Sequence, residues 1–121
     1  QKIGRFQIEV FPHPAIVNLF QLEKILKYKK GRLADRKLEL LKLQKYIINI
    51  LPTLEPALVI SHNFLNTETI NSITTLKTTE DKLDSLICAY IGAYWWYWGE
   101  TKNLVLGNHT TGYIVVPKRL D

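Results

Sequence analysis

The chain has 121 residues, of which 46% are hydrophobic and 22% are charged, and this balance excludes an intrinsically disordered chain. The formal net charge of +5 favours polyanionic partners such as nucleic acid, although many basic domains bind nothing charged. The most apolar stretch, Leu86–Trp98, is too short for a membrane span, which needs about 20 residues. We therefore expect residues 1–121 to form a single domain that is soluble and has no membrane partner.

Two features of the composition bear on the origin of the chain. Cys88 is the one cysteine, so a disulfide within the chain is excluded, and we expect a cytoplasmic location. The chain begins with Gln1 and contains no methionine. Because a natural translation product starts with methionine, we expect a processed or truncated piece of a protein, or a chain whose first residues are left out.

The first predicted elements are a strand and a helix. Phe6–Phe11 alternates apolar and polar residues, which predicts a half-buried strand. Pro12 ends this strand because proline cannot donate to a sheet ladder. Ala15–Lys27 repeats apolar residues at spacings of three and four, which predicts a helix. The cations that follow and Gly31 form its stop signal.

The middle of the chain is predicted to be mainly helical. Apolar residues repeat with the helical period over Ala34–Leu51, and Pro52 stops this long helix. Thr53–Thr67 contains proline and several polar residues, so we expect a loop there. Glu68–Leu76 is predicted to be a short helix.

The last part of the chain combines a helix with two strands. Thr79 is a plausible N-cap, because two acids follow it where negative charge is favoured in a first turn. The predicted helix runs to Trp98 and stops at the following glycine. Leu104–Leu106 and Gly112–Pro117 are predicted strands joined by a turn.

Three acids stand out by their positions: Glu9, Asp81 and Asp84. Asp81 and Asp84 lie three residues apart, so they share one face of their predicted helix, and the helical period places Asp84 at the edge of the apolar face. A divalent cation would remove the repulsion between them, since Mg²⁺ takes one or two carboxylates together with water. The alternative is structural: acids suit a helix start, and Glu9 would be ordinary on the outward face of an edge strand.

A basic run and an aromatic run are further candidates for binding. Lys27–Arg32, with the nearby Arg36 and Lys37, could contact phosphates, or these cations could simply complement a helix C-terminus. Tyr28 within this run could stack on a base or pack at the edge of the domain. The Tyr94–Trp98 run holds two adjacent tryptophans that one helix face cannot both bury, so it indicates either core packing or an interface.

Four segments, in this order, resemble one uncharacterised family. The segments are Glu9–Pro14, Tyr28–Arg32, Glu80–Tyr90 and Gly112–Pro117. The family is known as domain of unknown function 429 and is grouped with predicted nucleases of the ribonuclease-H-like superfamily. The resemblance implies an α/β fold with a mixed sheet flanked by helices. The chain would be the helix-rich C-terminal part of that fold, a partial domain without the N-terminal strand meander.

The same resemblance implies a function. The expected activity is that of a nuclease that hydrolyses phosphodiesters of nucleic acid with Mg²⁺ or Mn²⁺ as cofactor. The residues implied as catalytic groups and as metal ligands are Glu9, Asp81 and Asp84. The residues expected to bind the substrate are Lys29, Lys30, Arg32 and His13.

The chain also departs from the pattern of the superfamily. The first aspartate of the superfamily lies on the strand meander, to which nothing in this chain corresponds. We therefore expect an incomplete or inactive nuclease, and the alternative is a non-catalytic module that binds nucleic acid or a protein. A sheet edge left open by the missing strands, or the aromatic run, would suit a homodimer.

Overall fold

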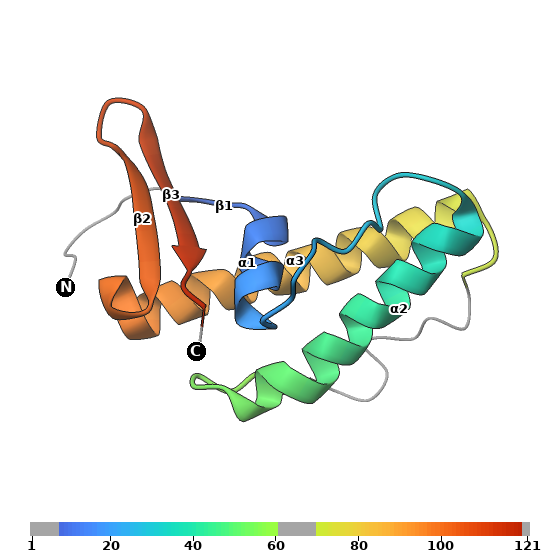
Figure 1. The fold of residues 1–121 in the computed structure, drawn as a ribbon, viewed down its shortest axis with the longest axis horizontal. Coiled ribbons are helices and arrows are strands. Elements are labelled where there is room, and N and C mark those ends of the chain that lie inside the picture. Colours follow the sequence, from blue (N-terminus) through green and yellow to red (C-terminus); the bar gives the residue numbers. More distant parts are fainter. Residues whose placement is uncertain (1–7, 61–69, 120–121) are drawn as a thin grey trace. The chain divides into compact units, whose positions relative to one another are not determined.

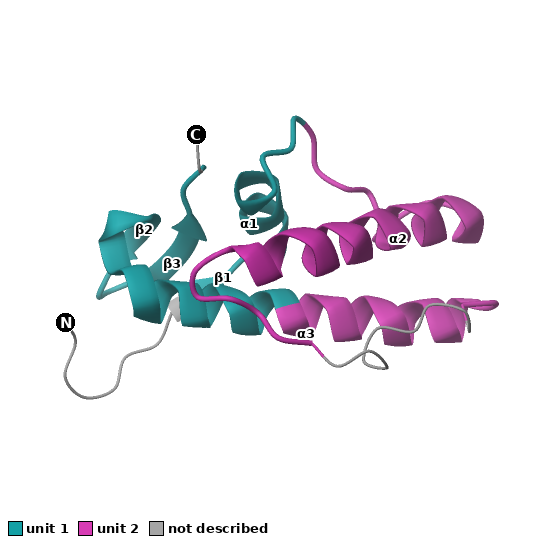
Figure 2. Ribbon diagram, turned by 90° about the horizontal axis from the view of Figure 1, so that it is seen from below, with its two compact units in different colours: residues 1–23, 87–121 teal, residues 24–86 magenta. Residues whose placement is uncertain are grey.

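The computed structural model describes residues 8–60 and 70–119, which combine helices with a small mixed sheet (Figure 1). The predicted α/β class is therefore confirmed. The chain divides into two compact units, residues 1–23 with 87–121 and residues 24–86 (Figure 2), which we call unit 1 and unit 2. That residues 1–121 act as a single domain stays a prediction. Within the described residues, no helix has the length and apolar character needed to cross a membrane.

Unit 1 contains a sheet of three described strands in the order β1-β3-β2 (Figure 1). The strands are β1 (Ile8–Val10), β2 (Asn103–Asn108) and β3 (Gly112–Pro117). β1 runs parallel to β3, and Glu9 pairs with Ile114. β2 runs antiparallel to β3. The mixed sheet and all three strand locations agree with the sequence predictions, and β1 is an edge strand of the described sheet.

A tight hairpin joins β2 to β3. The side-chain Oδ1 of Asn108 accepts hydrogen bonds from the backbone N–H groups of Thr110 and Thr111, at 2.8 and 2.9 Å, which is the local pairing that makes asparagine a turn residue. Gly107 has φ of +103°, and a Cβ atom there would lie 2.2 Å from the carbonyl oxygen of Gly112. The hairpin therefore requires glycine at position 107.

The first helix, α1, spans Pro12–Leu19, so the predicted range Ala15–Lys27 is wrong at both ends. The prolines belong to the first turn, where a missing N–H costs nothing. The helix ends where Gln21 adopts a left-handed φ of 55° and the N–H of Leu22 donates to the carbonyl of Val17 at 2.9 Å. This is a Schellman-type end, and its signal was missed because the left-handed residue is glutamine and not glycine.

α1 also has a fixed place in unit 1. Its buried residues are Ala15, Ile16 and Leu19, and it packs against β3. The side-chain amide of Asn18 donates to the carbonyl of Pro117 at 2.8 Å. The helix thus covers the strand that lies at the centre of the described sheet.

Unit 2 begins with an irregular segment and then the helix α2 (Leu33–Ile50), which a short 3₁₀ turn, η1 (Leu51–Thr53), extends. The predicted helix Ala34–Leu51 is confirmed to within one residue at each end. Its buried positions are Leu40, Leu43 and Ile47, at the spacing the helical period demands. Residues 54–60 form no helix or strand, as expected for a loop, and residues 61–67 of that prediction lie outside the described part.

The last helix, α3, is one continuous element over Ile73–Trp98, so the two predicted helices with an N-cap at Thr79 are wrong. Ser72 caps it, because the Ser72 Oγ accepts from the N–H of Thr75 at 3.2 Å while the Thr75 Oγ1 accepts from the N–H of Ser72 at 3.0 Å. This reciprocal pairing is a capping box. The hydroxyl of Thr79 instead donates to the carbonyl of Thr75 within the helix, at 3.1 Å. Residues 68 and 69 of the predicted short helix are not described.

The aromatic run lies on the final turns of α3, in unit 1. Trp95 is buried, whereas the neighbouring Trp96 is 67% exposed, which confirms that the helix cannot bury both. The Nζ of Lys102 lies 3.9 Å from the centre of the Trp98 ring, within cation–π range. The helix ends at Trp98 as predicted, and Gly99 follows with φ of +56°.

Candidate functional site

The strongest concentration of charge in unit 2 lies on α3 around Glu80. Only 2% of Glu80 is exposed, and a carboxylate so buried is costly unless it is paired. Glu80 and Asp84 lie four residues apart, so they occupy one face of the helix. We call these two acids, with Lys29, Arg36 and Tyr28, the ionic cluster.

Three cations surround the buried carboxylate of Glu80. Lys29 Nζ donates to Glu80 Oε2 at 2.7 Å, and Arg36 Nη2 donates to Glu80 Oε1 at 2.9 Å. Lys77, one turn earlier on α3, places its Nζ 3.5 Å from Glu80 Oε2. Both oxygens of Glu80 are therefore paired, which is the condition for keeping a charge in the interior.

Asp84 shares the same ammonium group. Lys29 Nζ donates a hydrogen bond to Asp84 Oδ2, and the hydroxyl of Tyr28 donates to Asp84 Oδ1 at 2.8 Å. Arg36 Nε also donates to the backbone carbonyl of Tyr28, at 3.1 Å. The cluster thus ties the segment before α2 to both α2 and α3.

The cluster shifts the protonation equilibria of its members. Burial disfavours the charged form of Glu80, but the hydrogen bond and charge of Lys29, with the help of Arg36 and Lys77, outweigh it and lower the pKa below the ordinary 4.5. Burial also disfavours charge on Lys29, yet Asp84 and Glu80 outweigh it and raise that pKa above the ordinary 10.5. Both groups are therefore held in their charged forms.

These shifts predict a pH window for stability. A lowered Glu80 pKa contributes stability that is present above about pH 4.5 and is lost as the pH falls through the folded-state value. A raised Lys29 pKa contributes stability that is lost only as the pH rises past 10.5. We expect the urea midpoint of the wild-type chain to fall between pH 5 and pH 3 by more than that of a Glu80→Gln variant. Equal falls in the two proteins would contradict the role given to Glu80.

The three predicted acids lie in different settings. Asp84 is half-buried in the ionic cluster, at the edge of the apolar face as the helical period predicted. Asp81 has a side chain that is 63% exposed and lies 3.4 Å from Lys77 Nζ. Glu9 is exposed on β1, in unit 1. The convergence of Glu9 with the two aspartates stays a prediction.

The predicted substrate-binding residues are divided between the two units. Lys29 belongs to the ionic cluster, whereas Lys30 and Arg32 are exposed on the irregular segment that precedes α2. His13 lies on α1, in unit 1. Because that segment is not helical, the alternative of cations at a helix C-terminus is wrong.

The position of Tyr28 excludes base stacking, which was one of its two predicted roles. Its side chain is fully buried and its hydroxyl is bound to Asp84. The ring therefore offers no exposed face on which a base could stack. The alternative was that Tyr28 packs at the edge of the domain, and the structure places it fully inside.

Sequence reasoning missed the burial of Glu80. It considered Arg36 for a phosphate contact or a helix C-terminus, and not for its ion pair with Glu80. Glu80 was assigned to a first turn, because the helix was expected to begin at Thr79. In the continuous helix Glu80 instead follows Leu76 by four residues and precedes Leu83 by three, and both leucines are fully buried. An acid within an apolar repeat was the available signal.

The two acids of the ionic cluster already face a cation of the chain itself. Two carboxylates converge on a single ammonium group, which shows that this position holds positive charge. Among residues 8–60 and 70–119, no group of three or more His, Cys, Asp or Glu side chains could hold a metal ion. A divalent metal at Asp84 would therefore need a ligand from outside this cluster, and it would compete with Lys29.

The fold and the cluster together define a mixed α/β protein with ion-paired acids on its longest described helix. The chain belongs to the family described as "Protein of unknown function (DUF429)", whose model matches residues 1–111. This match confirms the family that the four segments indicated. No curated protein matches the chain significantly, and no solved structure does so either.

Proposed function

We propose that the chain is the acid-bearing, C-terminal part of a ribonuclease-H-like domain, and that this domain is a divalent-metal-dependent nuclease acting on nucleic acid phosphodiesters. The observation that carries the proposal is the half-buried Asp84, which shares a cation with the buried Glu80 on α3. The grouping of this family with predicted ribonuclease-H-like nucleases, which comes from the resemblance described above, adds to the proposal. A cytoplasmic location would suit such a substrate.

Each residue has a role in this proposal. Asp84 and Asp81 would hold the metal ion, and Mg²⁺ or Mn²⁺ would supply Lewis acidity when bound. Lys30 and Arg32 are exposed on the segment that the ionic cluster ties down, so they are free to meet phosphate groups. Glu80 would act indirectly, because it positions Lys29 and therefore the carboxylate of Asp84.

The test is cleavage of labelled single-stranded and double-stranded nucleic acid by the full-length natural protein in Mn²⁺. We expect Asp84→Asn to reduce the rate by about 100-fold or more, since loss of an outer-shell partner of a metal alone costs 10–100-fold. The matched control is Asp35→Asn, because Asp35 is an exposed acid in the first turn of α2. Full cleavage by Asp84→Asn, with its fold verified by circular dichroism, would exclude the proposal.

A second candidate is a non-catalytic module that binds nucleic acid. It is favoured by the engagement of both Asp84 oxygens within the ionic cluster. Such a module would bind without added metal, and its affinity would fall steeply with salt as phosphate contacts do. Homodimerisation through the edge of β1 or through exposed aromatic residues such as Trp96 is compatible with either candidate.

A further inference from the structure

Helix α2 is apolar on two faces that point in different directions. Its core face holds Leu40, Leu43 and Ile47, all fully buried. At about 100° per residue, Leu41 and Ile48 lie well away from that face. Ile48 is 45% exposed, and Leu38, on the same side of the helix, is 59% exposed. A helix of a globular protein needs only one apolar stripe for its core, so the second stripe is available for a further contact.

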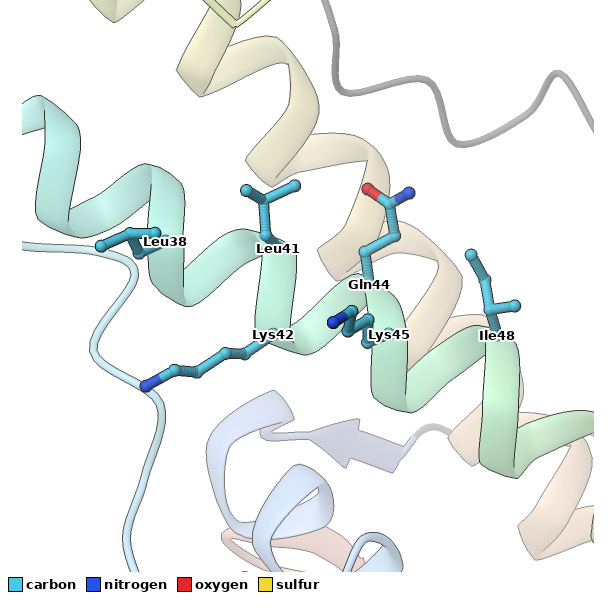
Figure 3. A pocket seen from close by; sticks show the side chains of 6 residues that line it. All are labelled: Leu38, Leu41, Lys42, Gln44, Lys45 and Ile48. Carbon is cyan, nitrogen blue, oxygen red and sulfur yellow. The ribbon is translucent and has the colours of Figure 1, made fainter.

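The second stripe forms a shallow groove along the helix. Six side chains line it, and all of them come from α2: Leu38, Leu41, Lys42, Gln44, Lys45 and Ile48. In Figure 3, Leu41, Gln44 and Ile48 project to the same side from successive turns, while Lys42 extends the other way. The residues from Leu38 to Ile48 cover about 15 Å of helix, which is the length over which two helices exchange three or four side chains.

The charged side chains of this groove indicate what kind of ligand would suit it. Its two charged side chains are Lys42 and Lys45, and no acid lines it. The nearest acid in the sequence, Glu39, already accepts from the backbone N–H of Lys27 at 2.9 Å and lies 2.8 Å from Lys42 Nζ. Lys42 is thus paired within the chain, and a ligand with a carboxylate beside its apolar stripe would be complementary in charge to Lys45.

A second copy of this chain fits less well. If two α2 helices packed antiparallel with Leu38 opposite Ile48, then Leu41 would face Lys45 of the other copy. Both Lys45 ammonium groups would enter the seam with no acid of the groove to receive them. Burying such charges unpaired is costly, so the groove disfavours self-association.

From the second apolar stripe and its two lysines, we propose that the outer face of α2 is a docking site for an amphipathic helix of a partner protein, with leucine-like anchors and flanking Asp or Glu side chains. The site is independent of the proposed nuclease function, because it uses none of the ionic cluster. The apolar anchors would lie on Leu38, Leu41 and Ile48, and an acid would meet Lys45, since Lys42 is already paired with Glu39.

The test uses two fluorescent helical peptides with the same leucine stripe, one flanked by glutamates and one by lysines. We expect the chain to bind the glutamate peptide and not the lysine peptide, with an affinity that falls as salt rises. The double variant Leu38→Ser, Ile48→Ser should weaken binding by about tenfold or more, from the lost apolar contact. Lys45→Glu should shift the preference toward the lysine peptide.

The matched control is Ile73→Ser, because Ile73 is an equally exposed apolar residue on α3, outside the groove. We expect this variant to bind like the wild type. Equal binding of both peptides, or unchanged binding by the double serine variant, would overturn the proposal. So would sedimentation showing a dimer that the double serine variant abolishes, since the face would then belong to a second copy.

Discussion

Replacing Glu80 with glutamine is expected to lower the free energy of unfolding by about 3 kcal/mol, the low end for breaking a buried ion pair. The variant keeps the shape of the side chain but leaves Lys29 and Arg36 facing a neutral amide in place of the carboxylate that both contact. The low end is appropriate because part of Lys29 reaches solvent. Urea unfolding at pH 7, followed by tryptophan fluorescence, measures the change.

The matched control is Asp81→Asn, on the next residue of the same helix. The Asp81 side chain is largely exposed and its one described ion pair is with the exposed Lys77, so we expect a change of at most about 0.5 kcal/mol. If Glu80→Gln proved no more destabilising than Asp81→Asn, the ionic cluster would not hold the segment before α2 in place.

Removing the side chain of Tyr28 is expected to cost still more. Tyr28→Ala deletes a fully buried aromatic ring and should lower the free energy of unfolding by about 4 kcal/mol, as large core truncations of aromatic residues do. The same urea experiment measures it. A loss below about 1 kcal/mol, within the range of ordinary surface substitutions, would show that the ring is not part of the core.

Tyr28→Phe separates the ring from its hydroxyl. This variant keeps the packing but removes the hydrogen bond to Asp84 Oδ1, so we expect a loss of about 1.5 kcal/mol, as for a hydrogen bond to a charged group. If Tyr28→Phe were as destabilising as Tyr28→Ala, the hydroxyl and not the ring would carry the effect.

Tyr28 and Lys29 connect the stability of the chain with the proposed function. Tyr28 and Lys29 anchor a segment that forms no helix or strand, and its neighbours Lys30 and Arg32 are exposed. The anchored segment presents these cations from a defined place, which is what preorganised phosphate contacts require. Variants that release the anchor should therefore weaken any binding to nucleic acid even though they leave both cations intact.

The ends of the helices show where local sequence patterns predicted the structure correctly and where they did not. α2 agreed with prediction because a long apolar repeat and Pro52 both act locally. α1 was predicted too long because apolar residues continue past Leu19, although the chain turns at Gln21. α3 was divided in two because Thr79 and the following acids imitate a helix start, whereas the cap is Ser72 with Thr75.

In the candidate site too, local patterns predicted some features correctly and could not predict others. The helical period placed Asp84 at the edge of the core, and that placement is correct. No local pattern could pair Lys29 with Glu80, since 51 residues separate them in the sequence. In the structure, Lys29, predicted to bind phosphate, donates a hydrogen bond to Asp84, predicted to bind a metal ion.

By itself, the sequence determined the three strands and the positions of the apolar helix faces, because periodicity and turn chemistry act over a few residues. The family and the α/β class came from the resemblance of four segments, and not from these local patterns. Only the tertiary structure decided that Glu80 is buried, that Tyr28 is inaccessible and that α2 keeps a second apolar face in solvent. Those facts depend on which distant segments meet, and the energy of a buried charge depends on the partners it finds there.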